Sequence, residues 1–89
     1  MQIFEISVIN RLGLHARACA KIVDIASRFR CNVSIVVKGR RASARSIAAV
    51  MLLTASMGSV VRLEAEGADE VAAIREIAAL FQDGFGEWS

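Results

Sequence analysis

Apolar and polar residues alternate in some parts of the chain and recur at helical spacing in others. Residues 3–9 alternate, which predicts a strand with Phe4, Ile6 and Val8 on one face. From residue 16 to residue 29 the apolar positions recur every three or four residues, which predicts an amphipathic helix. Its apolar stripe consists of Cys19, Ile22, Val23, Ala26 and Phe29.

The middle of the chain predicts two short strands and a second helix. Residues 32–37 are rich in β-branched side chains, and the turn sequence at 38–41 leads into another short strand. Residues 46–57 predict a helix that Ser46 caps and Gly58 ends. One face of this helix is expected to cover the core with Ala49, Val50, Leu53 and Met57.

A third alternating segment and a third helix complete the pattern. Residues 59–66 predict a strand, and Asp69 is expected to cap a helix that closes near Gly84. The inward side chains of this helix are expected to be Ile74, Ile77, Ala78 and Phe81. The order β-α-β-β-α-β-α favours an antiparallel or mixed sheet with helices on one face, which is an α+β open-faced sandwich.

Length and composition favour one folded domain over residues 1–89. The chain is 55% hydrophobic, has no proline and shows no repeat or linker, so it can bury one modest core. Its longest apolar run, residues 47–57, is too short to cross a bilayer, and its N-terminus lacks the features of a secretory signal. We therefore expect a cytoplasmic protein without membrane insertion.

The residue types that bind metals are sparse. Cys19 and Cys31 are isolated, and together with one histidine they make a poor metal set. A disulfide is also not expected, because a helix from residue 16 would separate the two cysteines by more than about 10 Å. We expect reduced thiols, no metal and no cofactor.

The net charge of +2 hides an asymmetry. Residues 1–50 carry nine Lys or Arg against two acids, which gives +7, and residues 51–89 carry two against seven, which gives −5. A basic half indicates an anionic partner, which could be nucleic acid, a phosphate or an acidic protein surface. Charge alone does not choose among these.

The single histidine, His15, lies where the first helix is expected to begin. Backbone amides at a helix N-terminus attract anions and disfavour a protonated imidazole, so a phosphoryl group on this ring would lie in an anion site. Arg17 supplies planar donors for phosphate oxygens, and Gly13 is expected to allow a sharp turn and leave room for an incoming group. The alternative is that His15 is only a helix cap or a surface residue.

The segment GLHARACA, residues 13–20, resembles the active-site signature of HPr, the histidine-containing phosphocarrier of the bacterial phosphotransferase system. Other parts of the chain also match that family, in its proteobacterial form. They are the segment ARSIAAVMLL at residues 44–53, the turn at Gly58, the EGADE segment before the last helix, and the chain length. The resemblance implies a four-stranded antiparallel sheet covered on one face by three helices.

By that resemblance the protein is a phosphoryl relay and not a self-sufficient enzyme. His15 would accept phosphate on Nδ1 from phospho-enzyme I, which phosphoenolpyruvate charges, and would pass it to an enzyme IIA protein, in sugar uptake or in regulation. Arg17 would steady the phosphate. Ser46 matches the family's regulatory serine, the substrate of an HPr kinase in some hosts. We expect a monomer.

The family's docking patch maps onto Ala20, Ile47, Ala48 and Met51. The alternative is that the three residues of the second helix belong to the hydrophobic core. However, that helix is apolar on nearly all sides and a single core covers only one face, so the other apolar residues are expected to be exposed or to contact a partner. Three residues depart from the family pattern and bear on partner preference. They are Ala18 in place of the usual proline, Ala48 in place of a bulkier residue, and Thr54 where glycine is frequent.

The main rival function is a small basic nucleic-acid-binding module. Such a module needs exposed aromatic side chains on which bases stack, and the aromatic residues here lie mostly at core or terminal positions. They are Phe4, Phe29, Phe81, Phe85 and Trp88. A third possibility, a regulatory homologue without carrier function, is disfavoured because such relatives lack the histidine.

Overall fold

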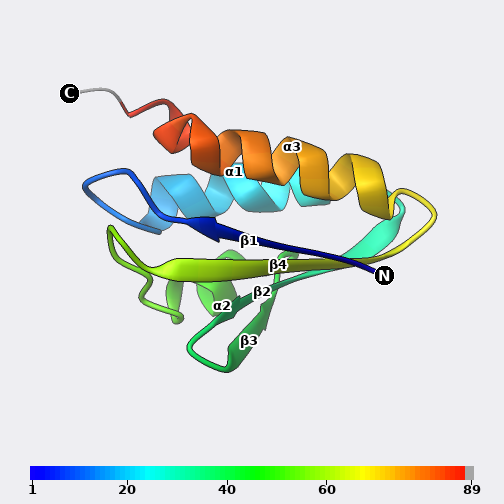
Figure 1. Cartoon of the computed structure of the whole chain (residues 1–89), viewed down its shortest axis with the longest axis horizontal. Helices are drawn as coiled ribbons and strands as arrows, with labels where there is room; N and C mark the ends of the chain where they lie inside the picture. The colour runs from blue at the N-terminus through cyan, green and yellow to red at the C-terminus, as the bar shows by residue number, and fades with distance from the viewer. Residues whose placement is uncertain (88–89) are drawn as a thin grey trace.

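A computed structural model describes residues 1–87, so Trp88 lies outside the described residues. These residues form four strands and three α-helices, followed by a short 3₁₀ turn (Figure 1). In chain order these are β1 (Gln2–Ser7), α1 (Ala16–Ala26), β2 (Cys31–Val37), β3 (Arg40–Ser43), α2 (Ile47–Met51), β4 (Val60–Gly67), α3 (Glu70–Gln82) and η1 (Gly84–Gly86). The predicted element order is confirmed.

The four strands form one antiparallel sheet in the order β1-β4-β2-β3. The central strand β4 pairs with β1 on one side, where Phe4 lies opposite Leu63, and with β2 on the other, where Ile35 lies opposite Leu63. Because opposed residues share a face, the apolar sets of the three strands point to the same side of the sheet.

The helices α1 and α3 cover that apolar side, and α2 packs against α1 and β3 (Figure 1). The α+β open-faced architecture with an antiparallel sheet is therefore confirmed. All four predicted inward side chains of α3 are buried, and so are Cys19, Ile22 and Ala26 of α1. Val23 of α1 is only partly buried, and Phe29 is also partly buried because it lies beyond the end of α1 at Ala26.

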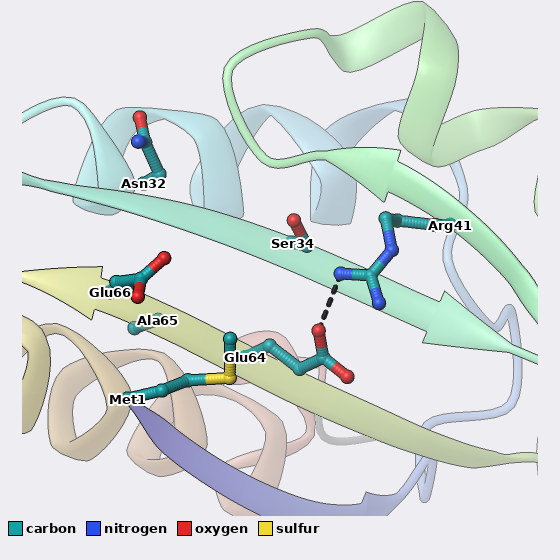
Figure 2. Close-up of a pocket in the computed structure, with 7 residues that line it drawn as sticks. All are labelled: Met1, Asn32, Ser34, Arg41, Glu64, Ala65 and Glu66. Atoms are coloured by element: carbon teal, nitrogen blue, oxygen red, sulfur yellow. Dashed lines mark hydrogen bonds and ion pairs between the residues drawn. The ribbon is translucent and has the colours of Figure 1, made fainter.

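The opposite face of the sheet is open and carries charged side chains (Figure 2). Glu64 of β4 is 6% exposed and forms ion pairs with Arg41 of β3 and Arg62 of its own strand, the latter at 2.8 Å. A small pocket beside this network is lined by residues that include Asn32 and Ser34. Since Ser34 and Glu64 are register partners, this pocket lies on the face that the helices do not cover.

The second helix is shorter than predicted, because it ends at Met51 and not near Met57. A guanidinium from the neighbouring strand satisfies a carbonyl at its end: Arg40 Nη2 donates to Leu52 O at 2.8 Å. Thr54 then adopts a positive φ of 50°, which takes the chain out of the helix. The residues beyond this point are therefore free to hydrogen-bond elsewhere.

Gly58 does not end a helix, so that prediction is wrong. It lies in a turn over residues 56–59, closed by Ser59 N donating to Ser56 O at 2.9 Å. This turn joins the segment that follows β1: Gly58 N donates to Val8 O at 2.8 Å, and Val8 N donates to Ser59 O at 2.9 Å. Met57, predicted as core, is 59% exposed for the same reason. Val50 and Leu53 are buried as predicted, and Ala49 is partly buried.

The start of α3 and the end of β1 also differ in detail from the prediction. Asp69 lies at the N-cap position of α3 but makes no capping hydrogen bond, because its carboxylate accepts from Arg30 N at 2.7 Å. Val8 follows β1 instead of belonging to it, although it is buried as its phase predicts. Among residues 1–87 no helix is long and apolar enough to span a membrane.

Candidate functional site

The loop before α1 is fixed against the segment that follows α2. Leu14 N donates to Ala55 O at 2.9 Å, and Gly13 has a positive φ of 67°. A Cβ atom at Gly13 would lie 2.5 Å from Ala55 O, which no ordinary contact allows. Glycine is therefore required here by its backbone angle and by this close approach. The space beside it belongs to Ala55 and not to an incoming group, which corrects the sequence-based expectation.

His15 is the N-cap residue of α1, as its position in the sequence predicted. Its backbone is extended (φ −78°, ψ 177°), and its Nδ1 atom accepts a hydrogen bond from Arg17 N at 3.2 Å. The imidazole therefore takes the place that a serine or aspartate side chain fills at most helix starts. The side chain is 26% exposed, so the ring is partly enclosed but accessible.

The other ring nitrogen of His15 faces a carboxylate from the far end of the chain. His15 Nε2 contacts Glu87 Oε2, and Asn10 Nδ2 donates to Glu87 Oε1 at 2.9 Å. Asn10 is 4% exposed and donates its second amide hydrogen to Gly13 O at 2.9 Å. One buried amide thus ties the loop before α1 to Glu87.

The segment that carries Glu87 is anchored by two further contacts. Phe85 is fully buried, and its ring lies edge-on to Phe81 with centroids 4.9 Å apart. Its carbonyl accepts from Lys21 Nζ at 2.6 Å, which joins the segment to α1. These contacts hold the backbone in front of Glu87, so its carboxylate reaches His15 from a fixed position.

Hydrogen bonds and nearby charge determine the protonation of Glu87 and the tautomer of the neutral His15 ring. The hydrogen bond from Asn10 holds the pKa of Glu87 below its ordinary value against the opposing effect of burial, and the proximity of His15 adds to the lowering. Glu87 is therefore a carboxylate. Because Nδ1 of His15 accepts from Arg17 N, the neutral ring carries its proton on Nε2 and a lone pair on Nδ1.

Arg17 lies in the first turn of α1 with an exposed side chain. Within residues 1–87 its guanidinium makes no hydrogen bond or ion pair. Together with Leu12, His15, Ala16 and Glu87 it lines an open depression on the surface. The structure therefore brings the two predicted site residues, His15 and Arg17, to one hollow at the start of a helix. A nucleophilic nitrogen, helix amides and a cation there suit an anion that bonds to the ring.

The residues predicted to dock partners are exposed. Ala20 lies on α1, and Ile47, Ala48 and Met51 lie on α2, which packs against α1. Ile47 is 41% exposed and Met51 39%, so the alternative that these side chains are core is wrong. We refer to Ala20, Ile47, Ala48 and Met51 as the apolar patch.

Ser46 is the N-cap residue of α2. Its Oγ accepts from Ala49 N at 3.1 Å, as its position before the helix predicted. The side chain is partly buried, and the adjacent Arg45 directs its guanidinium toward Cys31 O at 3.2 Å. The capping role is confirmed.

Asn10, Lys21 and Glu87 are the site residues that the sequence did not reveal. Asn10 follows a strand and Glu87 follows a glycine-rich turn, and neither position carries a motif. Their relation depends on how α3 runs back across the sheet to the start of α1, which only the tertiary structure shows (Figure 1).

The chain is similar in sequence and in fold to phosphocarrier proteins. A family model described as the phosphorylation site of the PTS HPr component matches residues 3–83. The chain is 47% identical over 83 residues to phosphocarrier protein HPr of Xylella fastidiosa, which covers 93% of each chain. It is 45% identical, with the same coverage, to HPr of Cupriavidus necator. A crystal structure of HPr from Thermoanaerobacter tengcongensis superposes over 100% of both chains with a TM-score of 0.95 at 38% identity.

Proposed function

Because this chain belongs to the HPr family of phosphocarrier proteins, we propose that His15 is the residue on which it carries the phosphoryl group. The protein is a phosphocarrier of the phosphotransferase system that relays phosphate between enzyme I and enzyme IIA. It is a relay and has no catalytic turnover of its own.

The observation that carries the proposal is the hydrogen bond from Arg17 N to His15 Nδ1. It directs the nucleophilic lone pair of the ring at the N-terminus of α1. A phosphoryl group that replaced this hydrogen would lie against the first amides of the helix, where negative charge is stabilised by about 0.3–1 kcal/mol or more. The structure therefore favours Nδ1 as the phosphorylated atom.

Arg17 is proposed to steady the phosphoryl group through its guanidinium. The side chain lies in the first turn of α1 and lines the same depression as the ring. A planar guanidinium can donate two hydrogen bonds to phosphate oxygens and match the charge that spreads over them during transfer. Because the described part of the protein gives this guanidinium no other partner, it is free to do so.

The apolar patch is proposed to dock enzyme I and enzyme IIA. It lies on α1 and α2, in the half of the chain with the basic excess, so an acidic partner surface would meet both charge and apolar contact. This combination supports a protein partner over nucleic acid. Phe81 and Phe85 are buried and Phe29 is partly buried, so among residues 1–87 Phe4 on β1 is the one exposed aromatic side chain, and one ring makes a poor platform for base stacking. We further propose that the protein acts as a cytoplasmic monomer.

Ser46 is proposed as a regulatory site where the host has an HPr kinase. It precedes Ile47 of the apolar patch, so a phosphate of about −1.5 to −2 charges would stand where an acidic partner docks. Its capping role exists without any modification, and the two roles separate experimentally.

Phosphorylation by phosphoenolpyruvate and enzyme I tests the main proposal. We expect one phosphoryl group per chain, with the acid-labile and base-stable linkage of a nitrogen–phosphorus bond, and none in His15→Ala. A His15→Ala protein that still takes up the label would contradict the assignment. Melting temperature and circular dichroism of the variant show whether it is folded.

A further inference from the structure

Glu87 reaches the reacting ring through one of its carboxylate oxygens while the other is held in place. Oε2 contacts His15 Nε2, and Oε1 accepts from Asn10 Nδ2 at 2.9 Å. Glu87 itself is 20% exposed at its side chain, and Asn10 is buried. A carboxylate with both oxygens engaged and little exposure has few other orientations available.

Asn10 has one orientation that fits its surroundings. Its Nδ2 faces two acceptors, Gly13 O and Glu87 Oε1, so the amide nitrogen and not the oxygen points at Glu87. The opposite orientation would set the amide oxygen against a carbonyl and a carboxylate. Asn10 thereby fixes Glu87 in the same way that a third group fixes the base in hydrolytic triads.

The contact between Glu87 and His15 bears on the chemistry of phosphoryl transfer. The Nδ1 lone pair forms the bond to phosphorus, the bond between phosphorus and its donor atom breaks, and that electron pair stays with the donor. The proton on Nε2 remains, so the phosphorylated ring is positively charged, and the Glu87 carboxylate faces that charge. When the phosphoryl group moves on, the N–P bond's electrons return to Nδ1 and a neutral imidazole leaves.

The proton on Nε2 matters most in that second step. If Nε2 lost its proton in the phosphorylated state, the leaving group would be an imidazolate anion, which is far more basic than imidazole. A carboxylate that accepts from Nε2–H favours the protonated ring nitrogen by charge and by hydrogen bonding. At the same time the Arg17 amide, which loses its ring acceptor on phosphorylation, becomes available to a phosphoryl oxygen.

We propose that Glu87 is a positioning residue for phosphoryl transfer, which holds the proton of His15 on Nε2, and that Asn10 orients Glu87 for this role. The inference rests on the proposed function of His15 as the phosphorylated residue. It assigns a role in the reaction to a segment that lies outside the helix-start motif and that sequence reasoning did not identify.

Two variants and a control test the role of Glu87. Glu87→Ala removes the acceptor, Glu87→Gln keeps an oxygen that can accept from Nε2–H without the charge, and Glu76→Gln removes one exposed acid of α3 away from His15. We expect phosphoryl transfer from enzyme I to slow on the order of tenfold in Glu87→Ala, the lower end of the loss seen when the hydrogen-bond partner of a metal-binding imidazole is removed, and less in Glu87→Gln. Glu76→Gln should match wild type.

The ring nitrogens of the unphosphorylated protein provide a second readout. Because the chain has one histidine, a long-range ¹H–¹⁵N spectrum reports without ambiguity which ring nitrogen bears the proton. We expect Nε2 to bear it in wild type and Glu76→Gln, and both nitrogen shifts to move in Glu87→Ala with partial recovery in Glu87→Gln. Shifts and rates in Glu87→Ala that match Glu76→Gln would overturn the inference.

The outcome is separable from the test of His15 itself. The ring spectra need neither enzyme I nor phosphate, so they report on the contact with Glu87 even if another residue proved to be phosphorylated. Conversely, full phosphorylation of His15 with no effect of Glu87→Ala on spectra or rate would leave the proposed function intact and remove the role of Glu87. Melting temperatures of all variants exclude a general loss of structure.

Discussion

The backbone amide of Arg17 donates a hydrogen bond to Nδ1 of His15 at 3.2 Å, so one residue contributes to the site twice. Its amide orients the ring before transfer, and its guanidinium lines the same depression. A side-chain substitution at Arg17 therefore removes the second contribution and leaves the first.

We expect Arg17→Ala to slow phosphoryl transfer about a hundredfold, because the guanidinium matches charge that develops on the phosphoryl oxygens. The free energy of unfolding should change by less than about 0.5 kcal/mol, since the side chain is exposed. Rapid-quench transfer assays and thermal melts measure the two effects. Arg75→Ala, which removes the same charge from exposed α3, is the control; a large stability loss in Arg17→Ala would show that Arg17 is structural.

Met51→Asp should weaken binding to enzyme I about tenfold or more, because it places a charge in the apolar patch. Val71→Asp is the matched control, since Val71 is an exposed apolar residue at the start of α3, where an acid is compatible with the helix dipole. Calorimetry at low and high salt should show binding that weakens with salt but persists. Tight DNA or RNA binding with a steep salt dependence, unaffected by Met51→Asp, would support the rival nucleic-acid function.

At Ser46 the cap and the charge can be separated by three substitutions. Ser46→Ala should lower the free energy of unfolding by about 1 kcal/mol, because the bond to Ala49 N is lost, whereas Ser46→Asn and Ser46→Asp both keep a capping oxygen. Only Ser46→Asp adds charge beside Ile47, so it alone should slow transfer from enzyme I, by about tenfold. Equal rates for Ser46→Asp and Ser46→Asn would leave Ser46 as a helix cap without a regulatory effect.

Acid should weaken the fold partly through Glu64 on the open face of the sheet. The hydrogen bond from Arg41 holds the pKa of Glu64 below its ordinary value of 4.5, against the opposing effect of burial. A carboxyl group whose folded pKa is lowered stabilises the protein above its unfolded pKa, and this stabilisation is lost as the pH falls through the folded pKa.

Glu64→Gln should therefore be less stable than wild type by about 1 kcal/mol at neutral pH, and the difference should be smaller at about pH 3, below the ordinary pKa of the group. Urea denaturation of both proteins at the two pH values measures it. Glu66→Gln, on the same strand and exposed, is the control. A deficit of equal size at both pH values would show that the charge of Glu64 does not carry the effect.

The elements with a strong apolar pattern were predictable from the sequence, and α2 was only partly so. Its N-terminus follows from Ser46, a local signal, but its end depends on Arg40 from β3 and on the bonds that draw residues 55–59 toward Val8 and Leu14. Helix-forming residues continue past Met51, so local propensity alone predicts a longer helix. Tertiary hydrogen bonds decide the boundary.

The backbone conformation at residue 54 explains why glycine is frequent there in the family. Thr54 stands where the family often has glycine, and its φ is 50°. A left-handed conformation suits glycine and is uncommon for a β-branched residue, so the frequent glycine fits the geometry observed here. The resemblance identified the position, and the structure supplies its physical reason.

The candidate site likewise contains some residues that the sequence predicts and others that only the tertiary structure shows. His15 and Arg17 belong to one helix start, where spacing and known chemistry suffice to predict their proximity. Glu87 meets His15 only because α3 and η1 bring the chain back to α1, and Asn10 joins them through a single buried amide. Such a contact leaves no periodic or spaced signal in the sequence.

The sheet order also bears on how the chain folds. Within residues 1–87, β1 has β4 as its single neighbour and pairs Gln2 with Ala65, a partner that lies far along the chain. Pairings that join residues so distant in sequence close large loops and are slow to form. We therefore expect the local β2–β3 hairpin to form early, and the docking of β1 onto β4 to belong to the late, rate-limiting part of folding.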